Sequence, residues 1–384
     1  MDSNVTLIFI LSLIVVFSPH ISNFLRFPTT PIEIVLGSLL APLGLITADN
    51  SVTQDYFNLM AKVGFLYLMF LAGLEVNIKE IINASRRHFI GAMLFIGTMI
   101  ALGLIIGLWI LGMNAVMVTA MPLISIGLLA TLSKEYGKNR EWIKMAFYVG
   151  AIAEVLSITA LTVLEVSVAT GFQMELLIKI LYLLGYLSAI LALYYGFRLL
   201  FWWFPEFKTK MMPYSDDKDQ DFRLAIGIFF MMVMVMEMLH LELAFGAFVA
   251  GLFISTFFNH KRELEHKMSS FGFGFLIPIF FIHVGASFDY AVFYDVIYMA
   301  VGILVFMIVI RLGASTMLIK LIGVKHSILV AFSLSMPLTL LVATATVGSH
   351  YGFIEDIDYY AIILASLLEV IIFMSAIKII AKWK

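Results

Sequence analysis

Three ionisable side chains lie deep inside apolar segments of this sequence: Glu154, Arg311 and Glu369. A charged group at the centre of a bilayer costs roughly 2.5–3.5 kcal/mol on insertion scales, so a residue of this kind is by default a functional candidate. A carboxylate at such a depth can hold either a proton or a metal cation, because both compete for the same oxygens. We therefore take Glu154 as the candidate cation- and proton-binding residue, with Arg311 and Glu369 as core charge partners. The alternative is a static ion-pair cluster in which Arg311 pairs with Glu369.

Glu154 has polar companions at helical spacing. Ser157 follows about one turn later and is a second candidate ion-binding group. Glu165 lies eleven residues after Glu154, on the same helix face and near the outer mouth. His283, in the stretch FFIHVGASFD, is a candidate proton relay, although a single histidine in a membrane more often packs through a hydrogen bond. We therefore assign Glu165 and His283 to a possible ion pathway.

Two prolines, Pro122 and Pro337, interrupt apolar segments. Proline removes a backbone donor and clashes with the preceding turn, and in a membrane such a break is tolerated where it is buried or lines a cavity. Half-helix ends and nearby hydroxyl groups suit a cation site, which makes Ser125 a third candidate ion-binding group. The alternative is an ordinary proline kink. We predict two discontinuous helices, whose central residues include Pro122, Ile124, Pro337 and Thr339.

The composition decides the class of protein. Of the 384 residues, 62% are hydrophobic and 13% are charged, and the mean hydropathy is +1.02. A soluble domain would carry about 25% charged residues, so we predict an all-α polytopic membrane protein surrounded by lipid. The net charge of −2 is uninformative, and no basic tract suggests a nucleic-acid partner. Cysteine is absent, and no HExxH or GxSxG motif suggests an enzyme.

Thirteen apolar segments are long enough to cross a bilayer core of about 30 Å. They are approximately 4–19, 31–48, 57–75, 88–112, 115–133, 143–168, 175–203, 222–239, 241–258, 271–287, 294–319, 325–348 and 359–381. The loops between them are short, so we expect residues 1–384 to form a single transmembrane domain with no soluble domain.

Charge in the loops gives the orientation. The clear connections on one side, at 49–56, 113–114, 169–174, 288–293 and 349–358, contain no Lys or Arg. Most Lys and Arg residues fall on the other side, together with Lys382 and Lys384 at the C-terminus. This asymmetry is typical of cytoplasmic loops. It predicts an odd number of helices, with the N-terminus outside and the C-terminus inside.

Short stretches of the first half recur in order in the second half. The matched places are IEIVLGSLLA from Ile32 and LELAFGAFVA from Leu241, MPLIS from Met121 and MPLTL from Met336, and the Glu-Val pairs at 154–155 and 369–370. The first match has an offset of 209 residues and the other two share an offset of 215. Chance similarity between apolar segments is the alternative explanation.

These matches relate helices one to six, about 4–168, to helices eight to thirteen, about 222–381. The segment 175–203 is then a linker helix. An offset of seven helices reverses the direction of the chain in the membrane, so the predicted repeat is inverted. Many secondary transporters are built in this way, with the ion site at the interface of the two halves.

On these residues the chain resembles the monovalent cation:proton antiporters. It is similar to bacterial sodium/proton exchangers and to the membrane domains of glutathione-gated potassium efflux systems. The resemblance runs from GSLLAPLGL at Gly37 through LYLMFLAGLEV at Leu66 and PIFFIHVGASFD at Pro278 to RLGA at Arg311. It implies thirteen helices with crossed discontinuous helices five and twelve, a homodimer, and alternating access of the elevator type. It also implies a bacterial inner membrane, a periplasmic N-terminus and a role in pH homeostasis.

The resemblance assigns roles by position. Glu154 falls where the family has its cation- and proton-carrying Asp, and Arg311 falls on the conserved Lys or Arg of the core. Ile124 and Ser125 take the place of the usual Thr-Ser pair. Ala153 replaces the acid or amide that usually precedes the carrier, which indicates electroneutral exchange with one carboxylate or a changed ion selectivity. Glu369 has no family counterpart, and as the repeat-mate of Glu154 it is a candidate for the missing carboxylate.

We therefore expect a secondary active antiporter that exchanges Na⁺ or K⁺ for protons and needs no cofactor. Two other functions stay open from the sequence. An ion-coupled symporter of an organic anion would share the architecture, with a roomier cavity and Arg311 holding the anion. A transport-inactive sensor would have kept the fold and lost the site, which Ala153 would explain. The choice between Na⁺ and K⁺ and the presence of a regulatory subunit are not encoded in any motif found here.

Overall fold

The computed structural model of the chain is helical throughout the residues that it describes. Those residues are 3–25, 29–43, 51–75, 85–170, 219–239, 243–258, 262–287, 293–350 and 352–382, with scattered positions between 178 and 206. No strand occurs within these ranges, which agrees with the all-α prediction. Most of the predicted linker helix 175–203 falls outside the described residues.

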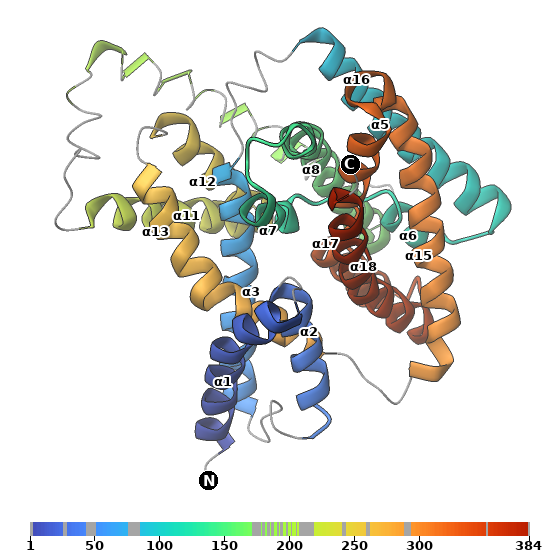
Figure 1. The fold of residues 1–384 in the computed structure, drawn as a ribbon, viewed down its shortest axis with the longest axis horizontal. Coiled ribbons are helices and arrows are strands. Elements are labelled where there is room, and N and C mark those ends of the chain that lie inside the picture. The colour runs from blue at the N-terminus through green and yellow to red at the C-terminus, as the bar shows by residue number, and fades with distance from the viewer. Residues whose placement is uncertain are drawn as a thin grey trace.

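The described helices pack as two groups (Figure 1). The first group contains α1 (Ser3–Leu25), α2 (Thr29–Leu40), α3 (Ser51–Glu75), α11 (Gln220–Met238), α12 (Leu243–Phe257), α13 (Arg262–Phe271), the π-helical turn η2 (Gly272–Leu276) and α14 (Ile277–Ala286). The second contains α5 (Arg86–Leu104), the π-helical turn η1 (Ile105–Ile110), α6 (Ala115–Ala120), α7 (Gly127–Tyr136), α8 (Glu141–Thr170), α15 (Phe293–Ser315), the 3₁₀ turn η4 (Thr316–Leu318), α16 (Ile319–Ser333), α17 (Leu338–His350) and α18 (Asp356–Lys382). The groups meet where α3 packs on α7 and where α2 packs on α18.

Among the described residues, six helical segments are long and apolar enough to cross a membrane. They are Leu7–Leu25, Gln54–Leu74, Arg86–Ile110, Glu263–Ala286, Phe293–Ser333 and Asp356–Lys382. The apolar helix Leu243–Phe257 is shorter. The prediction of a multi-pass helical membrane protein is therefore confirmed, because so many apolar segments of this length need a lipid environment.

The longest of these segments, Phe293–Ser333, turns at Gly323. The backbone there has a φ of +79°, a conformation that is open to glycine and costly for residues with a Cβ atom. The turn separates α15 and η4 from the later part of α16. It falls between the predicted segments 294–319 and 325–348.

In the first group, α2 and α14 cross at two glycines. A Cβ atom at Gly37 would lie 2.2 Å from the carbonyl oxygen of Ile282, and one at Gly285 would lie 1.9 Å from that of Ile34. Both distances are far shorter than atoms allow, so the two backbones come this close because neither position carries a side chain. Small residues serve this purpose in membrane helix packing, where close contact replaces the hydrophobic effect.

The crossing of α3 and α12 repeats the same arrangement. A Cβ atom at Gly73 would lie 2.1 Å from the carbonyl oxygen of Phe248, and one at Gly251 would lie 2.0 Å from that of Phe70. In both crossings each glycine faces the residue three positions before the opposite glycine. These two reciprocal contacts join the helices of the first group into a tightly packed unit.

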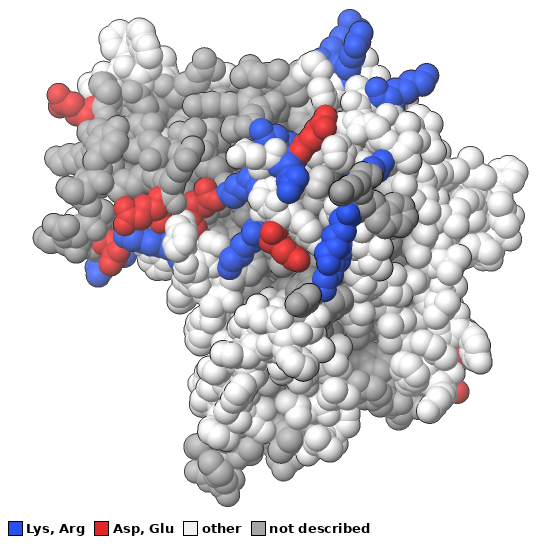
Figure 2. Space-filling model, in the orientation of Figure 1, with Lys and Arg blue, Asp and Glu red and all other residues white. Residues whose placement is uncertain are grey.

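Charged side chains gather on one face of the molecule, while wide areas elsewhere on the viewed surface carry none (Figure 2). Lys138, in the turn between α7 and α8, pairs there with Glu265 on α13. Lys134 on α7 lies 4.5 Å above the ring of Phe273 in η2. Both contacts connect the second group of helices to the first.

Candidate functional site

The first broken helix lies in the second group. Helix α6 ends at Ala120 and α7 begins at Gly127, and the residues between them are not helical. Pro122 in this segment has no backbone N–H and cannot continue the helix of α6. The carbonyl groups at the end of α6 and the amide groups at the start of α7 therefore need partners from elsewhere in the protein.

Arg311 on α15 supplies the partners for the carbonyl groups. It is 1% exposed. Its Nη1 donates to the carbonyl oxygen of Met121 at 3.1 Å, and its Nη2 donates to that of Leu123 at 3.0 Å. The C-terminal end of a helix carries a partial negative charge, so a guanidinium group is the complementary side chain there. Arg311 thus stabilises the C-terminal end of α6, whose carbonyl groups lack partners within the helix.

Glu154 and Ser157 on α8 supply the partners for the amide groups. The N–H of Ile126 donates to Oε2 of Glu154 at 2.8 Å, and the N–H of Ile124 donates to Oγ of Ser157 at 2.9 Å. Glu154 is 0% exposed, and Ser157 is also buried. The start of α7 carries a partial positive charge, which a carboxylate complements. The spacing of three residues on α8 places both side chains along the same segment.

The two carboxyl oxygens of Glu154 differ in their hydrogen bonding. No hydrogen-bond donor among the described residues reaches Oε1. The Ser125 side chain borders the same carboxyl group, and its Oγ accepts from the N–H of Gly127 at 3.3 Å. The structure therefore brings together the three residues that the sequence proposed for the ion site: Glu154, Ser125 and Ser157. Carboxylate and hydroxyl oxygens beside a helix N-terminus are ligands that a hard cation or a proton can use.

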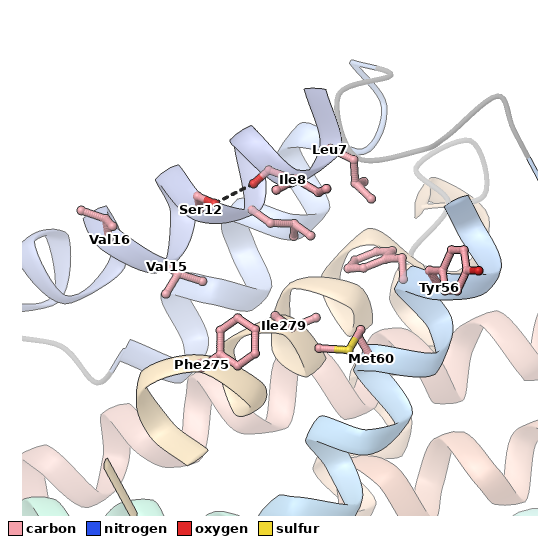
Figure 3. Close-up of a pocket in the computed structure, with 11 residues that line it drawn as sticks. Leu7, Ile8, Ser12, Val15, Val16, Tyr56, Met60, Phe275 and Ile279 are labelled. Carbon is pink, nitrogen blue, oxygen red and sulfur yellow. Dashed lines mark hydrogen bonds between the residues drawn. The ribbon is translucent and has the colours of Figure 1, made fainter. Parts of the chain in front are cut away.

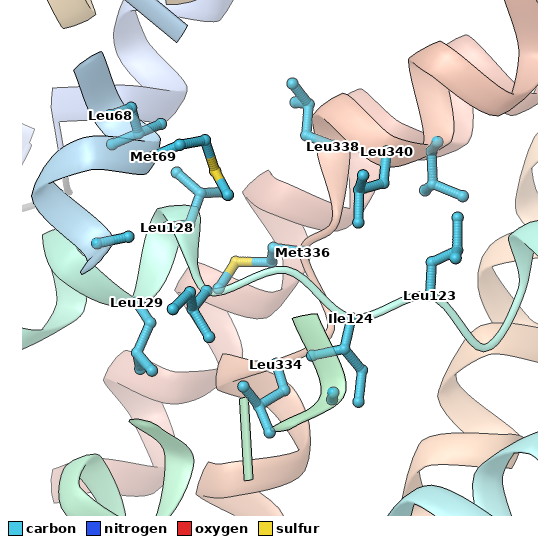
Figure 4. Close-up of a cluster of buried hydrophobic side chains, with 14 of the residues drawn as sticks. Leu68, Met69, Leu123, Ile124, Leu128, Leu129, Leu334, Met336, Leu338 and Leu340 are labelled. Carbon is cyan, nitrogen blue, oxygen red and sulfur yellow. The ribbon is translucent and has the colours of Figure 1, made fainter. Parts of the chain in front are cut away.

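The second broken helix lies against the first. Helix α16 ends at Ser333 and α17 begins at Leu338, and buried Pro337 closes the interruption. Helix α6 packs on α17 and α7 packs on α16, so the two helices cross at their breaks. Figure 4 shows Leu123 and Ile124 of the first break near Leu334 and Met336 of the second. Apolar side chains therefore line the breaks. The polar side chains of Glu154 and Ser157 reach the first break from α8, and that of Arg311 reaches it from α15.

Gly150 is a residue of this site that the sequence reasoning did not single out. It precedes Glu154 by one turn of α8, and a Cβ atom there would lie 2.2 Å from the Ile126 side chain and 2.9 Å from that of Leu334. The missing side chain lets both broken helices approach α8 together. A glycine one turn before a deep carboxylate was the only signal available in the sequence.

Glu369 on α18 is 0% exposed, and neither of its carboxyl oxygens has a hydrogen-bond partner among the residues that the structure describes. It interacts electrostatically with Arg311. The direct ion pair expected as one alternative is not formed, because the guanidinium group of Arg311 is turned to the carbonyl groups of the first break. No hydrogen bond or ion pair of the described residues therefore joins Glu369 to Arg311.

One further candidate, His283, is placed away from this cluster. His283 lies on α14 in the first group, where its Nε2 is 2.8 Å from Oδ1 of Asn58 and its ring meets Phe57 edge-on. The side chains of Glu165 and Thr339 lie outside the described part of the structure. In the part that is described, no group of three or more His, Cys, Asp or Glu side chains could hold a metal ion. An ion at Glu154 would therefore be bound by one carboxylate, hydroxyl groups and backbone oxygens.

The sequence matches the profile of the sodium/hydrogen exchanger family, transmembrane region, over residues 8–383. The chain belongs to the sodium/hydrogen exchanger family. The match covers both broken helices and all three buried core charges, so the resemblance read from the motifs is confirmed.

Curated relatives of this chain carry antiporter names. The chain is 26% identical to the putative Na⁺/H⁺ antiporter YjbQ of Bacillus subtilis, over 90% of this chain and 57% of YjbQ. It is 22% identical to the Na⁺/H⁺-K⁺ antiporter GerN of Bacillus cereus, over 66% of this chain and 64% of GerN. It is 23% identical to the K⁺/H⁺ antiporter subunit KhtU of Bacillus subtilis, over 80% and 76% of the two chains. The chain thus spans less than two thirds of the length of YjbQ and GerN.

The fold of this chain is similar to that of a solved protein. The sodium proton antiporter MjNhaP1 of Methanocaldococcus jannaschii, solved at pH 8, superposes with a TM-score of 0.69. The superposition covers 98% of this chain and 100% of that chain, at 17% sequence identity. At this identity the likeness concerns the fold, and it extends to nearly every helix of the chain.

Proposed function

We propose that this exchanger moves a monovalent cation, Na⁺ or K⁺, across a bacterial inner membrane in electroneutral exchange for protons. The observation that carries the proposal is the open Oε1 of Glu154, buried between two crossing broken helices. The names of the relatives support a cation of this class, since they include Na⁺/H⁺ and K⁺/H⁺ antiporters. The chain itself serves as a transporter in a lipid bilayer, with the cation and the proton as its substrates.

The proposed mechanism is competition at Glu154. Its Oε2 is fixed by the N–H of Ile126, so the carboxyl group keeps one position and presents Oε1 to the arriving ion. A cation there would be shared with the Ser125 hydroxyl and nearby backbone oxygens. A proton on the carboxyl group removes the negative charge that attracts the cation, so only one of the two is held at a time. The second helix group then moves against the first, and the ion is released on the other side.

We also propose that the molecule contains thirteen membrane helices in two inverted repeats, and that it works as a homodimer with its N-terminus in the periplasm. The two glycine crossings support the repeat. If the two halves of the chain are superposed, the crossing of α2 and α14 corresponds to the crossing of α12 and α3. Gly37 is then equivalent to Gly251, and Gly73 is equivalent to Gly285. These offsets of 214 and 212 residues are near the 215 of the later matches, whereas the sequence alignment of Gly37 with Gly246 gave 209.

The symporter alternative finds no support at Arg311. Its two terminal nitrogens donate to the carbonyl oxygens of Met121 and Leu123, and the side chain is buried. An organic anion would have to displace these bonds and leave the end of α6 without partners. Arg311 is therefore engaged in supporting the broken helix, where an anion-binding arginine would be open to its ligand.

Reconstituted protein tests the proposed function. Liposomes that contain a pH-sensitive dye should report a change of internal pH after a pulse of Na⁺ or K⁺ with the wild type. The Glu154→Gln protein should give no change. Equal signals from both proteins would remove Glu154 as the carrier, and a wild type that responds to neither cation would overturn the antiporter assignment.

A further inference from the structure

Two neighbouring helical segments of the second group, α5 with η1 and α15 with η4, run in opposite directions. A Cβ atom at Gly91, near the start of α5, would meet the side chains of Leu318 and Leu321. One at Gly313, near the end of α15, would meet the side chain of Leu102, near the end of α5. The start of α5 therefore lies beside the end of η4 and the start of α16. Both segments belong to stretches that are long and apolar enough to cross a membrane.

The outward faces of these two helices are apolar. On α5, Ile90 and Met93 are 46% and 43% exposed, and their spacing places them on the same helix face as the exposed Arg86. On α15, Val305 and Val309 are 51% and 49% exposed and lie four residues apart, again on one face. Exposed apolar surface that continues over two packed helices is typical of a contact with lipid acyl chains. The two helices therefore present one lipid-facing surface.

The two ends of this lipid-facing surface carry different residues. Trp109, near the end of η1, is 88% exposed, and Tyr298, near the start of α15, is 87% exposed. At the opposite end, Arg86 and Arg87 begin α5 and Lys320 follows η4, and all three are exposed. Aromatic and basic side chains are the groups that meet the headgroup layers of a bilayer. The surface thus has the pattern of a membrane contact, with an apolar stretch between two headgroup layers.

The positive charges of Arg86, Arg87 and Lys320 are not balanced within the described part of the chain. No carboxylate there forms an ion pair with any of the three. The first turn of α5 contains no acidic residue, and two arginines at a helix N-terminus oppose its partial positive charge. Basic side chains project at the edge of the molecule where α5 begins, with no acidic side chain directly beside them in this view (Figure 2). An anion from outside the chain would balance these charges.

We propose that Arg86, Arg87 and Lys320 bind the phosphate of an anionic phospholipid whose acyl chains lie against the exposed faces of α5 and α15. Guanidinium groups hold phosphate oxygens in a bidentate geometry, and an ammonium group adds a point charge. A zwitterionic phospholipid carries its own positive charge beside the phosphate, so the site selects phosphatidylglycerol over phosphatidylcholine. Free phosphate lacks the acyl chains and binds more weakly. The inference concerns the outer surface of the second group and does not depend on the proposed exchange at Glu154.

Titration of the detergent-solubilised protein with fluorescent phosphatidylglycerol tests the proposal, with phosphatidylcholine of the same acyl chains for comparison. The wild type should bind phosphatidylglycerol at least about tenfold more tightly. Each basic residue near an anionic lipid contributes about fivefold in affinity, so Lys320→Gln should lose about fivefold and the double variant Arg86→Gln, Arg87→Gln about 25-fold. The matched control is Arg140→Gln, Arg223→Gln, which removes two exposed arginines from the turn before α8 and from α11. It should bind like the wild type.

Three results would overturn the proposal. They are equal wild-type affinities for the two lipids, equal losses in the control and in the α5 double variant, and full displacement of the lipid by millimolar inorganic phosphate. The last result would make this a site for free phosphate. Transport is not measured in these titrations, so a failed exchange assay would leave their outcome unchanged.

Two further measurements keep the proposal testable if the glutamine variants do not fold. Arg86→Lys, Arg87→Lys keeps both charges and should stay within about fivefold of the wild type. The wild type in about 1 M salt should lose most of its preference for phosphatidylglycerol, because salt screens exposed charges. Lysine variants that bind as weakly as a protein without these charges, with a losses of about 25-fold, or a preference that does not respond to salt, would refute the proposal.

Discussion

The carboxyl group of Glu154 on α8 accepts a hydrogen bond of 2.8 Å from the backbone N–H of Ile126 at the start of α7. Oε2 thereby satisfies the N–H at the start of α7, and Oε1 has no hydrogen-bond partner among the described residues. The residue proposed to carry the ion is therefore also a structural part of the element that crosses the membrane. Binding at Glu154 and the stability of α7 can be separated by choosing the substitution.

Glu154→Gln should keep the hydrogen bond from Ile126, because the amide oxygen can still accept it, while exchange is lost with the charge. Glu154→Ala should lose both, and an unpaired N–H in this buried segment should lower the free energy of unfolding by about 1–3 kcal/mol. Thermal unfolding in detergent separates the two variants. Glu33→Gln is the control, because Glu33 is buried in the other helix group and accepts from Ser18 at 3.1 Å. Loss of exchange in that control would show that the assay responds to any buried carboxyl.

Ser157→Ala should destabilise the first break without changing a charge. It leaves the N–H of Ile124 without its partner, at a cost of about 1–3 kcal/mol. Ser327→Ala is the matched control, since Ser327 is also fully buried and bonds the Gly323 carbonyl within its own helix. A differential measurement of the midpoint of thermal unfolding should rank Ser157→Ala well below the control. Equal midpoints would contradict the assigned contact.

Arg311→Lys and Arg311→Met should lower exchange and folded stability to different degrees. Lysine keeps the charge near Glu369 but cannot reach the carbonyls of Met121 and Leu123 with a rigid fork. Methionine leaves the carbonyl groups of Met121 and Leu123 without these donors in a buried segment, which should cost about 1–3 kcal/mol for each group. We expect reduced exchange in the lysine variant and loss of folded protein in the methionine variant, measured by size-exclusion profile and unfolding midpoint. A methionine variant as stable as the wild type would contradict the support that Arg311 gives to the first break.

Gly285→Ala should weaken the crossing of α2 and α14. Its new methyl group would meet the Ile34 carbonyl oxygen at 1.9 Å, so the helices must separate. Overpacking of this kind costs about 1–3 kcal/mol or more. Gly97→Ala on α5 is the control, because no atom lies within 4 Å of the added methyl group. The control should match or exceed the wild type in thermal stability, since alanine favours a helix over glycine by up to about 1 kcal/mol.

An apolar groove between α1, α3 and the η2–α14 segment illustrates how the first helix group meets the membrane (Figure 3). Its volume is about 590 Å³, and its lining includes Leu11, Val15, Met60 and Ile279. The polar hydroxyl of Ser12 is turned to the Ile8 carbonyl at 2.8 Å and adds no polar group to the groove. The wall is thus largely apolar, as expected for helices that face lipid.

Composition and periodic hydrophobicity were enough to predict a multi-pass helical protein, because backbone groups in lipid must be satisfied within helices. The two interruptions were also readable, since Pro122 and Pro337 each remove a backbone donor inside an apolar segment. Glu154, Arg311 and Glu369 stood out for a similar reason: a charge in an apolar helix has a cost that only a specific role offsets. These properties depend on residue type and local spacing, which the sequence contains in full.

Which groups meet was decided by the tertiary structure alone. Arg311 lies 190 positions after Met121 in the chain, and its choice of backbone carbonyls over Glu369 depends on how α15 packs beside α6. The part played by Gly150 and the reciprocal glycine contacts of α2 with α14 and of α3 with α12 likewise became visible only when helix backbones were in contact. Hydrogen bonds and close approaches are set by distances of a few tenths of an ångström between remote segments, and no spacing along a single chain encodes them.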